Sequence, residues 1–123
     1  MPKDDPGRQP FVGSCVANCT AVTSGFAEIG PVPPKKRLVV ESVSAELITS
    51  TSGLLHDIRL NGPFTLFMIP SLIGDGSSGF RRYFATHAIR FYVESGDSIQ
   101  FQVGTYGAAG EAACYVSGYF LDI

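Results

Sequence analysis

The sequence predicts an all-β protein, an antiparallel β-sandwich of about eight strands. The 14 glycines and 8 prolines are scattered over 123 residues and leave few uninterrupted stretches for helices. Apolar side chains at Ile99, Phe101 and Val103 alternate with glutamines, as in a strand that has one buried face. Short apolar segments recur between turn residues without a β-α-β unit, and this spacing is typical of a sandwich or a barrel.

The chain is expected to hold a short leader and one domain. Residues 1–10 combine three prolines with two acidic and two basic residues, a composition that predicts disorder. The segment Gly30–Pro34 holds three prolines and predicts a stiff, extended connector. A single β-sandwich domain then spans 11–123, and its first part, 11–34, can alternatively form an N-terminal arm beside the main body.

Three strands are predicted in the first half of the chain. Phe11–Val22 is small, apolar and partly β-branched, and Thr23–Gly25 can turn it into a second strand, Phe26–Ile29. Lys35–Ser52 is the longest segment without Gly or Pro and is rich in β-branched residues, which favours a third strand. One face of this strand is predicted to carry Val39, Val43, Ala45 and Leu47, with Glu41 as the exception.

A hairpin and a loop are predicted next. Leu54–Leu60 and Phe64–Ile69 flank Asn61-Gly62-Pro63, and Asn-Gly is the preferred pair of a type I′ hairpin turn. The segment Gly74–Gly79 consists of Gly, Ser and Asp and predicts a flexible loop.

The segment Phe80–Glu94 supports two interpretations. Its aromatic residues recur at helical spacing, but the opposite face mixes apolar residues with arginines, and apolar and polar residues alternate from Ala88 onward. We therefore predict a strand, with a helix over Phe80–Ala88 as the alternative. The last strand is expected at Ala113–Ile123, after a loop of small residues.

Charge and hydropathy exclude several classes of partner. The net charge is −2 and only 16% of residues are charged, so we expect no general attraction to nucleic acid. No run approaches the roughly 18 apolar residues of a membrane span. The N-terminus lacks the pattern of a signal peptide, which predicts a cytoplasmic protein, or a secreted or periplasmic one if a signal was removed.

Three cysteines leave the disulfide question open. Cys15 or Cys19 can bridge to Cys114, which leaves one thiol over, and the favoured interpretation is three buried, small, apolar side chains. In an extended strand the sulfurs of Cys15 and Cys19 lie roughly 13 Å apart, which is too far for a shared metal ion. The sequence therefore predicts no metal site.

Catalytic motifs are weak. Gly74-x-Gly76-x-x-Gly79 matches a dinucleotide-binding pattern, but the segment that follows is aromatic and extended rather than a helix. The neighbours His56 and Asp57 point to opposite faces of a strand and cannot easily form a dyad. We therefore expect no enzyme activity and no cofactor.

Two groups of residues are candidates for contacts. Basic and aromatic side chains suited to a sugar or an anionic ligand are Arg81, Arg82, Tyr83, Arg90 and Tyr92. A candidate subunit interface on the last strand consists of Tyr115, Tyr119 and Leu121, because tyrosine joins apolar area to a polar tip.

Two stretches resemble a group of small bacterial proteins. Pro33–Ala45 resembles their "P-x-G-K-R-L-V-I-E-x-V-S" opening, and Ile89–Asp97 together with Val116–Asp122 resembles their closing strands. This resemblance implies a bacterial protein and carries no function.

The C-terminal part also resembles the C1q/tumour-necrosis-factor family. Gly96–Val103 and Val116–Leu121 are similar to the last two strands of that jelly roll, "G-D-x-V-x-L-Q-V" and "F-S-G-F-L-L". The resemblance implies a jelly-roll-like sandwich and a homotrimer, favoured here over a dimer, that acts in recognition or as a structural module.

The leading hypothesis is a non-enzymatic β-sandwich that works by self-assembly or by binding a partner. A carbohydrate-binding module that uses exposed tyrosines and arginines is the first alternative. The second is a metal-dependent enzyme of jelly-roll type, built around His56, His87 and the cysteines.

Overall fold

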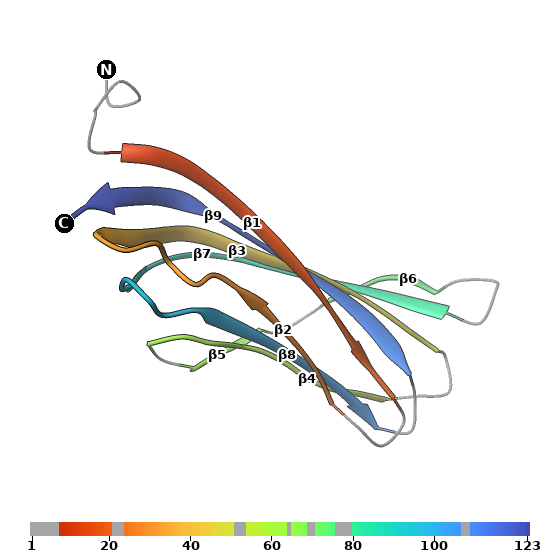
Figure 1. Ribbon diagram of the computed structural model, residues 1–123. Helices are drawn as coiled ribbons and strands as arrows, with labels where there is room; N and C mark the ends of the chain where they lie inside the picture. The colour runs from red at the N-terminus through yellow and green to blue at the C-terminus, as the bar shows by residue number, and fades with distance from the viewer. Residues whose placement is uncertain are drawn as a thin grey trace.

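The computed structural model describes residues 8–20, 24–50, 54–63, 65–68, 71–75, 80–106 and 109–123. Nine strands run through these residues (Figure 1). They are β1 (Arg8–Cys19), β2 (Gly25–Ile29), β3 (Lys36–Ser50), β4 (Leu54–Asn61), β5 (Thr65–Met68), β6 (Ser71–Asp75), β7 (Phe80–Val93), β8 (Ile99–Tyr106) and β9 (Gly110–Asp122). Within the described ranges there is no helix that could span a membrane. The all-β prediction is confirmed.

The strands form two antiparallel sheets that lie face to face (Figure 1). The large sheet has the order β1-β9-β3-β7-β6, and the small sheet has the order β2-β8-β4-β5. The strand pairs are nested along the chain, since β1 pairs with β9, β2 with β8, β3 with β7 and β4 with β5. A nested hairpin rolled into two sheets is a jelly roll. The predicted jelly-roll-like sandwich is therefore confirmed, with β6 added at the edge of the large sheet.

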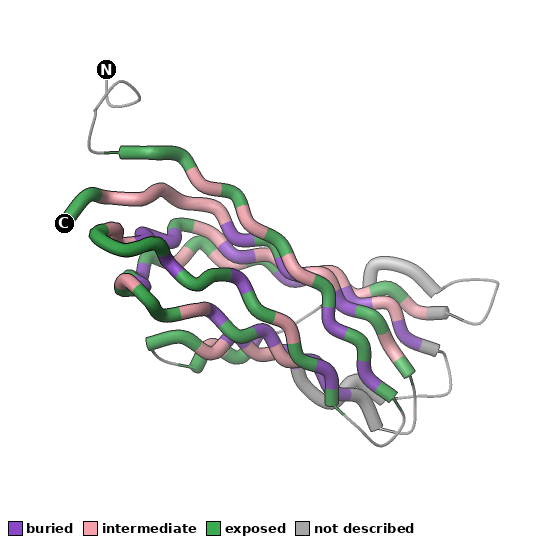
Figure 2. Tube along the Cα trace, in the orientation of Figure 1, coloured by how far each residue is buried: buried purple, intermediate pink, exposed green. Residues whose placement is uncertain are grey.

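The core lies between the two sheets and is built from alternate residues of each strand. Figure 2 shows this as buried positions that alternate with more exposed ones along the strands. Both sheets contribute, and the largest fully buried side chains include Phe101, Leu38, Leu47, Ile58, Leu60 and Ile99. Burial of these aliphatic and aromatic side chains is the main stabilising contribution in such a fold.

A register shift beside Glu41 changes which residues of β3 face the core. The pairing of β3 with both β7 and β9 is irregular between Val40 and Ser42. Val40 and Val43 both belong to the core cluster, whereas Val39 lies between two inward-pointing residues and therefore faces outward. The predicted common face was wrong at Val39, and the exposed Glu41 occupies the irregular position.

The N-terminal segment is part of both sheets. β1 pairs with β9 along its whole length, and β2 pairs with β8. Residues 11–34, for which an arm was the alternative, thus supply the outermost described strand on one side of each sheet. Arg8–Pro10, expected in the leader 1–10, belong to β1, while residues 1–7 lie outside the described residues.

The hairpin predicted around Asn61-Gly62 is confirmed, but its turn type was wrong. Asn61 of β4 pairs with Thr65 of β5, so Asn61 still belongs to the strand and Gly62 is the first residue of the connection. A type I′ turn needs positive φ at both central residues. In the described chain the glycines with positive φ are Gly30 and Gly96, and Gly62 is not among them.

The middle of the chain contains one strand that the sequence did not predict. Gly74 and Asp75, expected in the loop Gly74–Gly79, belong to β6, which pairs with β7; residues 76–79 lie outside the described residues. The strand prediction for Phe80–Glu94 is confirmed, because Phe80–Val93 forms the continuous strand β7.

Candidate functional site

Strand alternation divides the predicted basic and aromatic patch between the two faces of β7. Arg82, Arg90 and Tyr92 are exposed on the outer face of the large sheet. Tyr83 packs against the core, and Arg81, two residues away, shares its face. Arg82 lies about 26 Å along the strand from Arg90, whereas Arg90 and Tyr92 are about 7 Å apart. The structure therefore brings only Arg90 and Tyr92 together.

Arginines on the outer face of the large sheet lie beside carboxylates. Charged nitrogens approach carboxylate oxygens at 3.0 Å in Arg37–Glu94, 3.3 Å in Arg90–Glu41 and 3.8 Å in Arg82–Glu46. Exposed pairs of this kind contribute about 0.2–1 kcal/mol each. Their main effect here is to compensate the positive charge, which makes this face a poor site for an anionic ligand.

A row of aromatic side chains crosses the same face near the chain termini. Tyr119 of β9 and Tyr92 of β7 lie on either side of Val39 in cross-strand register. The Arg8 guanidinium lies 4.5 Å from the ring centroid of Tyr119, and that of Arg37 lies 5.7 Å from the centroid of Tyr92. Val39 is only 1% exposed although it points outward. The two tyrosines therefore act first as a cover for Val39.

The predicted interface residues of β9 lie next to apolar residues of β1 on the outer face of the large sheet. Tyr115 is 47% exposed, while Tyr119 and Leu121 are half-buried. On β1, Val12 is 79% and Val16 is 52% exposed. These five residues define the β1/β9 face. The two valines were not predicted as interface residues, because their position beside Tyr115 becomes visible only once the pairing of β1 with β9 is known.

The outer face of the small sheet carries a second row of side chains, which is exposed at its two ends. Phe26 of β2 and Phe67 of β5 stand at its ends, with Gln102 and Arg59 between them in register. The Arg59 guanidinium lies 5.0 Å from the centroid of the Phe67 ring. This row was not predicted from the sequence, since its four members come from four separate strands.

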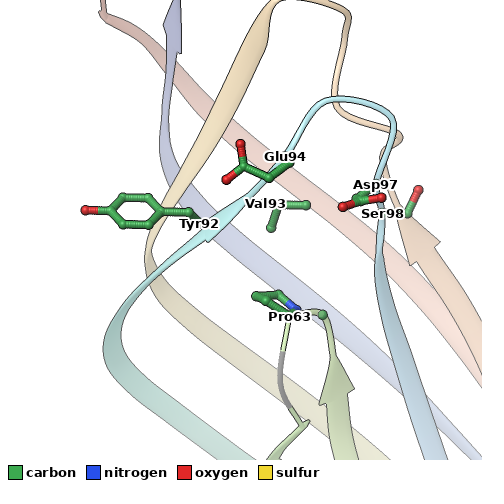
Figure 3. A pocket seen from close by; sticks show the side chains of 7 residues that line it. Pro63, Tyr92, Val93, Glu94, Asp97 and Ser98 are labelled. Atoms are coloured by element: carbon green, nitrogen blue, oxygen red, sulfur yellow. The ribbon is translucent and has the colours of Figure 1, made fainter. Parts of the chain in front are cut away.

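A pocket of about 400 Å³ opens at one end of the sandwich (Figure 3). It lies between the β4–β5 turn, the end of β7 and the β7–β8 turn, and its lining residues include Pro63, Tyr92, Glu94, Asp97 and Ser98. The Glu94 and Asp97 carboxylates can accept hydrogen bonds from hydroxyl groups. The Tyr92 ring points away from Pro63 and Asp97, along the outer face of the large sheet (Figure 3). Of the predicted binding residues, only Tyr92 lines this pocket.

Two thiols lie opposite each other on adjacent strands of the large sheet, on the side that faces the core. Cys15 of β1 and Cys114 of β9 are direct cross-strand partners and free thiols, Cys15 half-buried and Cys114 buried. A hydrogen bond with Cys114 lowers the pKa of Cys15, against the opposing effect of burial. The same hydrogen bond, burial and the negative charge of a Cys15 thiolate raise the pKa of Cys114.

The elements of a metal enzyme do not converge among the described side chains. His87 of β7 lies opposite Val43, and His56 is in β4, with its side chain outside the described set. No group of three His, Cys, Asp or Glu side chains in that set could hold a metal ion. The glycine pattern at 74–79 precedes a strand, whereas the dinucleotide-binding motif that it matches places the pyrophosphate at the N-terminus of a helix.

Comparison of the chain with protein-family models gave no match, and comparison with curated proteins gave no relative. The class that the structure defines is a jelly-roll β-sandwich with exposed apolar side chains on the outer faces of both sheets.

Proposed function

We propose that the protein is a non-enzymatic β-sandwich module that self-associates through the β1/β9 face. The observation that carries this proposal is the exposure of Val12 and Val16 on β1 beside Tyr115 on β9. Tyr115 pairs with Ser14, between the two valines, so the three side chains are diagonal neighbours on one surface. Contiguous exposed apolar surface of this kind usually marks a contact site.

The surroundings of these three residues suit contact with a second copy of the chain. Their cross-strand neighbours on the same surface are small and uncharged, at Ser14, Ala113 and Ser117. Two such surfaces can approach closely without burying an unpaired charge, which would be costly. β1 is also the outermost strand of the large sheet in the described chain, and an outermost strand offers its backbone for pairing.

The number of subunits follows from the resemblance rather than from this surface. The similarity to the C1q/tumour-necrosis-factor jelly roll favours a homotrimer, whereas a two-fold dimer is the commoner arrangement in general. We propose the trimer. A measured dimer mass would support self-association but refute the trimer.

Sedimentation equilibrium over a dilution series tests this proposal. The wild-type chain is expected to sediment above its monomer mass of 13.1 kDa, and Val12→Asp is expected to shift the population to monomer. Phe67→Asp is the matched control, because it places the same charge at an exposed apolar site on the small sheet. A wild-type monomer at every micromolar concentration would refute self-association.

A second candidate function is binding of a neutral carbohydrate at the end pocket. It is favoured by one observation, the presence of the Glu94 and Asp97 carboxylates in a concave site. Titration calorimetry with a panel of neutral oligosaccharides is expected to give binding that Asp97→Ala abolishes. Glu111→Ala, which removes an exposed carboxylate of β9 outside this pocket, should leave binding unchanged.

A further inference from the structure

The positions of Cys15 and Cys114 meet the requirements of a cross-strand disulfide. Directly opposite residues of an antiparallel pair project to the same face, with Cα atoms about 4.5–5.5 Å apart. Disulfides span Cα separations of about 4.4–6.8 Å. The two free thiols can therefore bridge without a change of register between β1 and β9.

The third cysteine is excluded from this pair by its place on the strand. Cys19 lies four residues beyond Cys15 on β1, about 13 Å away, and is opposite Gly110 rather than a cysteine. It is a buried thiol on the same strand. Cys19 therefore provides an internal control for any chemistry assigned to the pair.

The two thiols of the pair are not equivalent. Cys15 lies on the outermost described strand of the large sheet, where its side chain packs against the core but stays only half-buried. Cys114 is fully buried on the neighbouring strand. The hydrogen bond between them lowers the pKa of Cys15 and raises that of Cys114, so the thiolate forms on the more accessible sulfur.

We propose that Cys15 and Cys114 form a redox site, in which Cys15 reacts first and Cys114 closes a disulfide that links β1 to β9. The Cys15 thiolate attacks one sulfur of a small disulfide, such as oxidised glutathione, and one thiolate leaves. The Cys114 sulfur, after losing its proton, attacks the Cys15 sulfur and releases the second thiolate. The protein pair loses two electrons and two protons, and the small disulfide is reduced to two thiols.

Formation of the mixed disulfide at Cys15 favours the subsequent attack by Cys114. The raised pKa of Cys114 has three causes, and two of them, the hydrogen bond and the negative charge, depend on the Cys15 sulfur as a thiolate. A mixed disulfide at Cys15 carries no such charge. Deprotonation of Cys114 is then opposed mainly by burial, so the resolving thiol becomes more reactive once it is needed.

The test uses the full chain in glutathione redox buffers, followed by blocking of the remaining thiols and non-reducing peptide mapping. The expected product is a peptide pair linked through Cys15 and Cys114, formed to the same extent in the Cys19→Ala variant. Cys114→Ser should stop at a stable mixed disulfide on Cys15. Circular dichroism of each variant shows whether it has kept the β fold.

Three results would overturn the redox site. The first is a disulfide that includes Cys19, and the second is a mixed disulfide that persists on Cys15 in the wild type. The third is that Cys15 and Cys114 stay reduced under conditions in which dithiothreitol is fully oxidised. The first and second are read from the wild type and Cys19→Ala alone, so they stand even if Cys114→Ser fails to fold. The site does not depend on self-association, and sedimentation results leave it unaffected.

Discussion

A Cβ atom at Gly118 would lie 1.9 Å from the carbonyl oxygen of Val39. β9 and β3 approach each other this closely next to the register irregularity of β3. The obstructing atom belongs to the backbone of a central strand and cannot rotate away as the end of a side chain can. Gly118 is therefore required for the approach of the two strands.

Gly118→Ala is expected to lower the free energy of unfolding by about 3 kcal/mol or more, because the added methyl group forces the two strands apart. Urea denaturation measures this change. Gly62→Ala is the matched control, since its nearest neighbour would be a carbon of Phe91 at an ordinary 3.8 Å. Equal stability of the two variants would contradict the close approach of β9 to β3.

Phe101 and Phe67 give a second matched pair. Phe101 is 0% exposed in the core and Phe67 is 58% exposed on the outer face of the small sheet. Phe101→Ala should cost about 3–5 kcal/mol, because it removes buried apolar surface and leaves a cavity. Phe67→Ala should change stability by about 0.5 kcal/mol or less. If urea denaturation gave similar losses of unfolding free energy for the two variants, the assignment of Phe101 to the core and of Phe67 to the outer face would be wrong.

Two tyrosines of β9 should differ in their response to aspartate. Tyr115→Asp is expected to weaken self-association and leave monomer stability nearly unchanged, since Tyr115 is 47% exposed. Tyr119→Asp should also destabilise the monomer, because Tyr119 covers Val39 and stacks with Arg8. Sedimentation and urea denaturation measured on the same samples separate the two effects. Loss of stability in Tyr115→Asp would contradict its place on the outer face.

The pH dependence of Cys15 alkylation reports the hydrogen bond from Cys114. The thiolate is the reactive form, so a lowered pKa moves the rise of the rate with iodoacetamide to lower pH. Removing the donor in Cys114→Ala should raise the pKa of Cys15 and shift the profile to higher pH. Cys19→Ala should leave the profile in place. An unchanged profile in Cys114→Ala would disprove the hydrogen bond.

Local patterns in the sequence were sufficient to predict most strands. The alternation in Ile99–Val103 is visible in the chain because one face is apolar and the other is not, and this stretch opens β8. The irregular position at Glu41 was not visible, since a shift of register depends on β7 and β9 as well as on β3. The outward position of Val39 was not predicted for the same reason.

Surfaces were harder to predict than strands because their members are brought together by pairing between distant segments. The exposure of Tyr115 follows from the alternation of β9, but Val12 joins it only through the register of β1. Similarly, the sequence left the partner of Cys114 open between Cys15 and Cys19, and the register decides it. Tyr83 was misplaced because its strand face depends on which side of β7 meets the small sheet.

The nested order of strand pairs has a consequence for the folding pathway. The innermost pair closes between Asn61 and Thr65, whereas Cys15 and Cys114 of the outermost pair are 114 − 15 = 99 positions apart. The entropy cost of loop closure rises with chain separation, and folds of high contact order form slowly, over milliseconds to seconds. We therefore expect β1 and β9 to join late, on a template that the inner strands have already formed. The β1/β9 face that we propose for self-association does not exist before that step, so association through this face is expected to follow the folding of the inner strands.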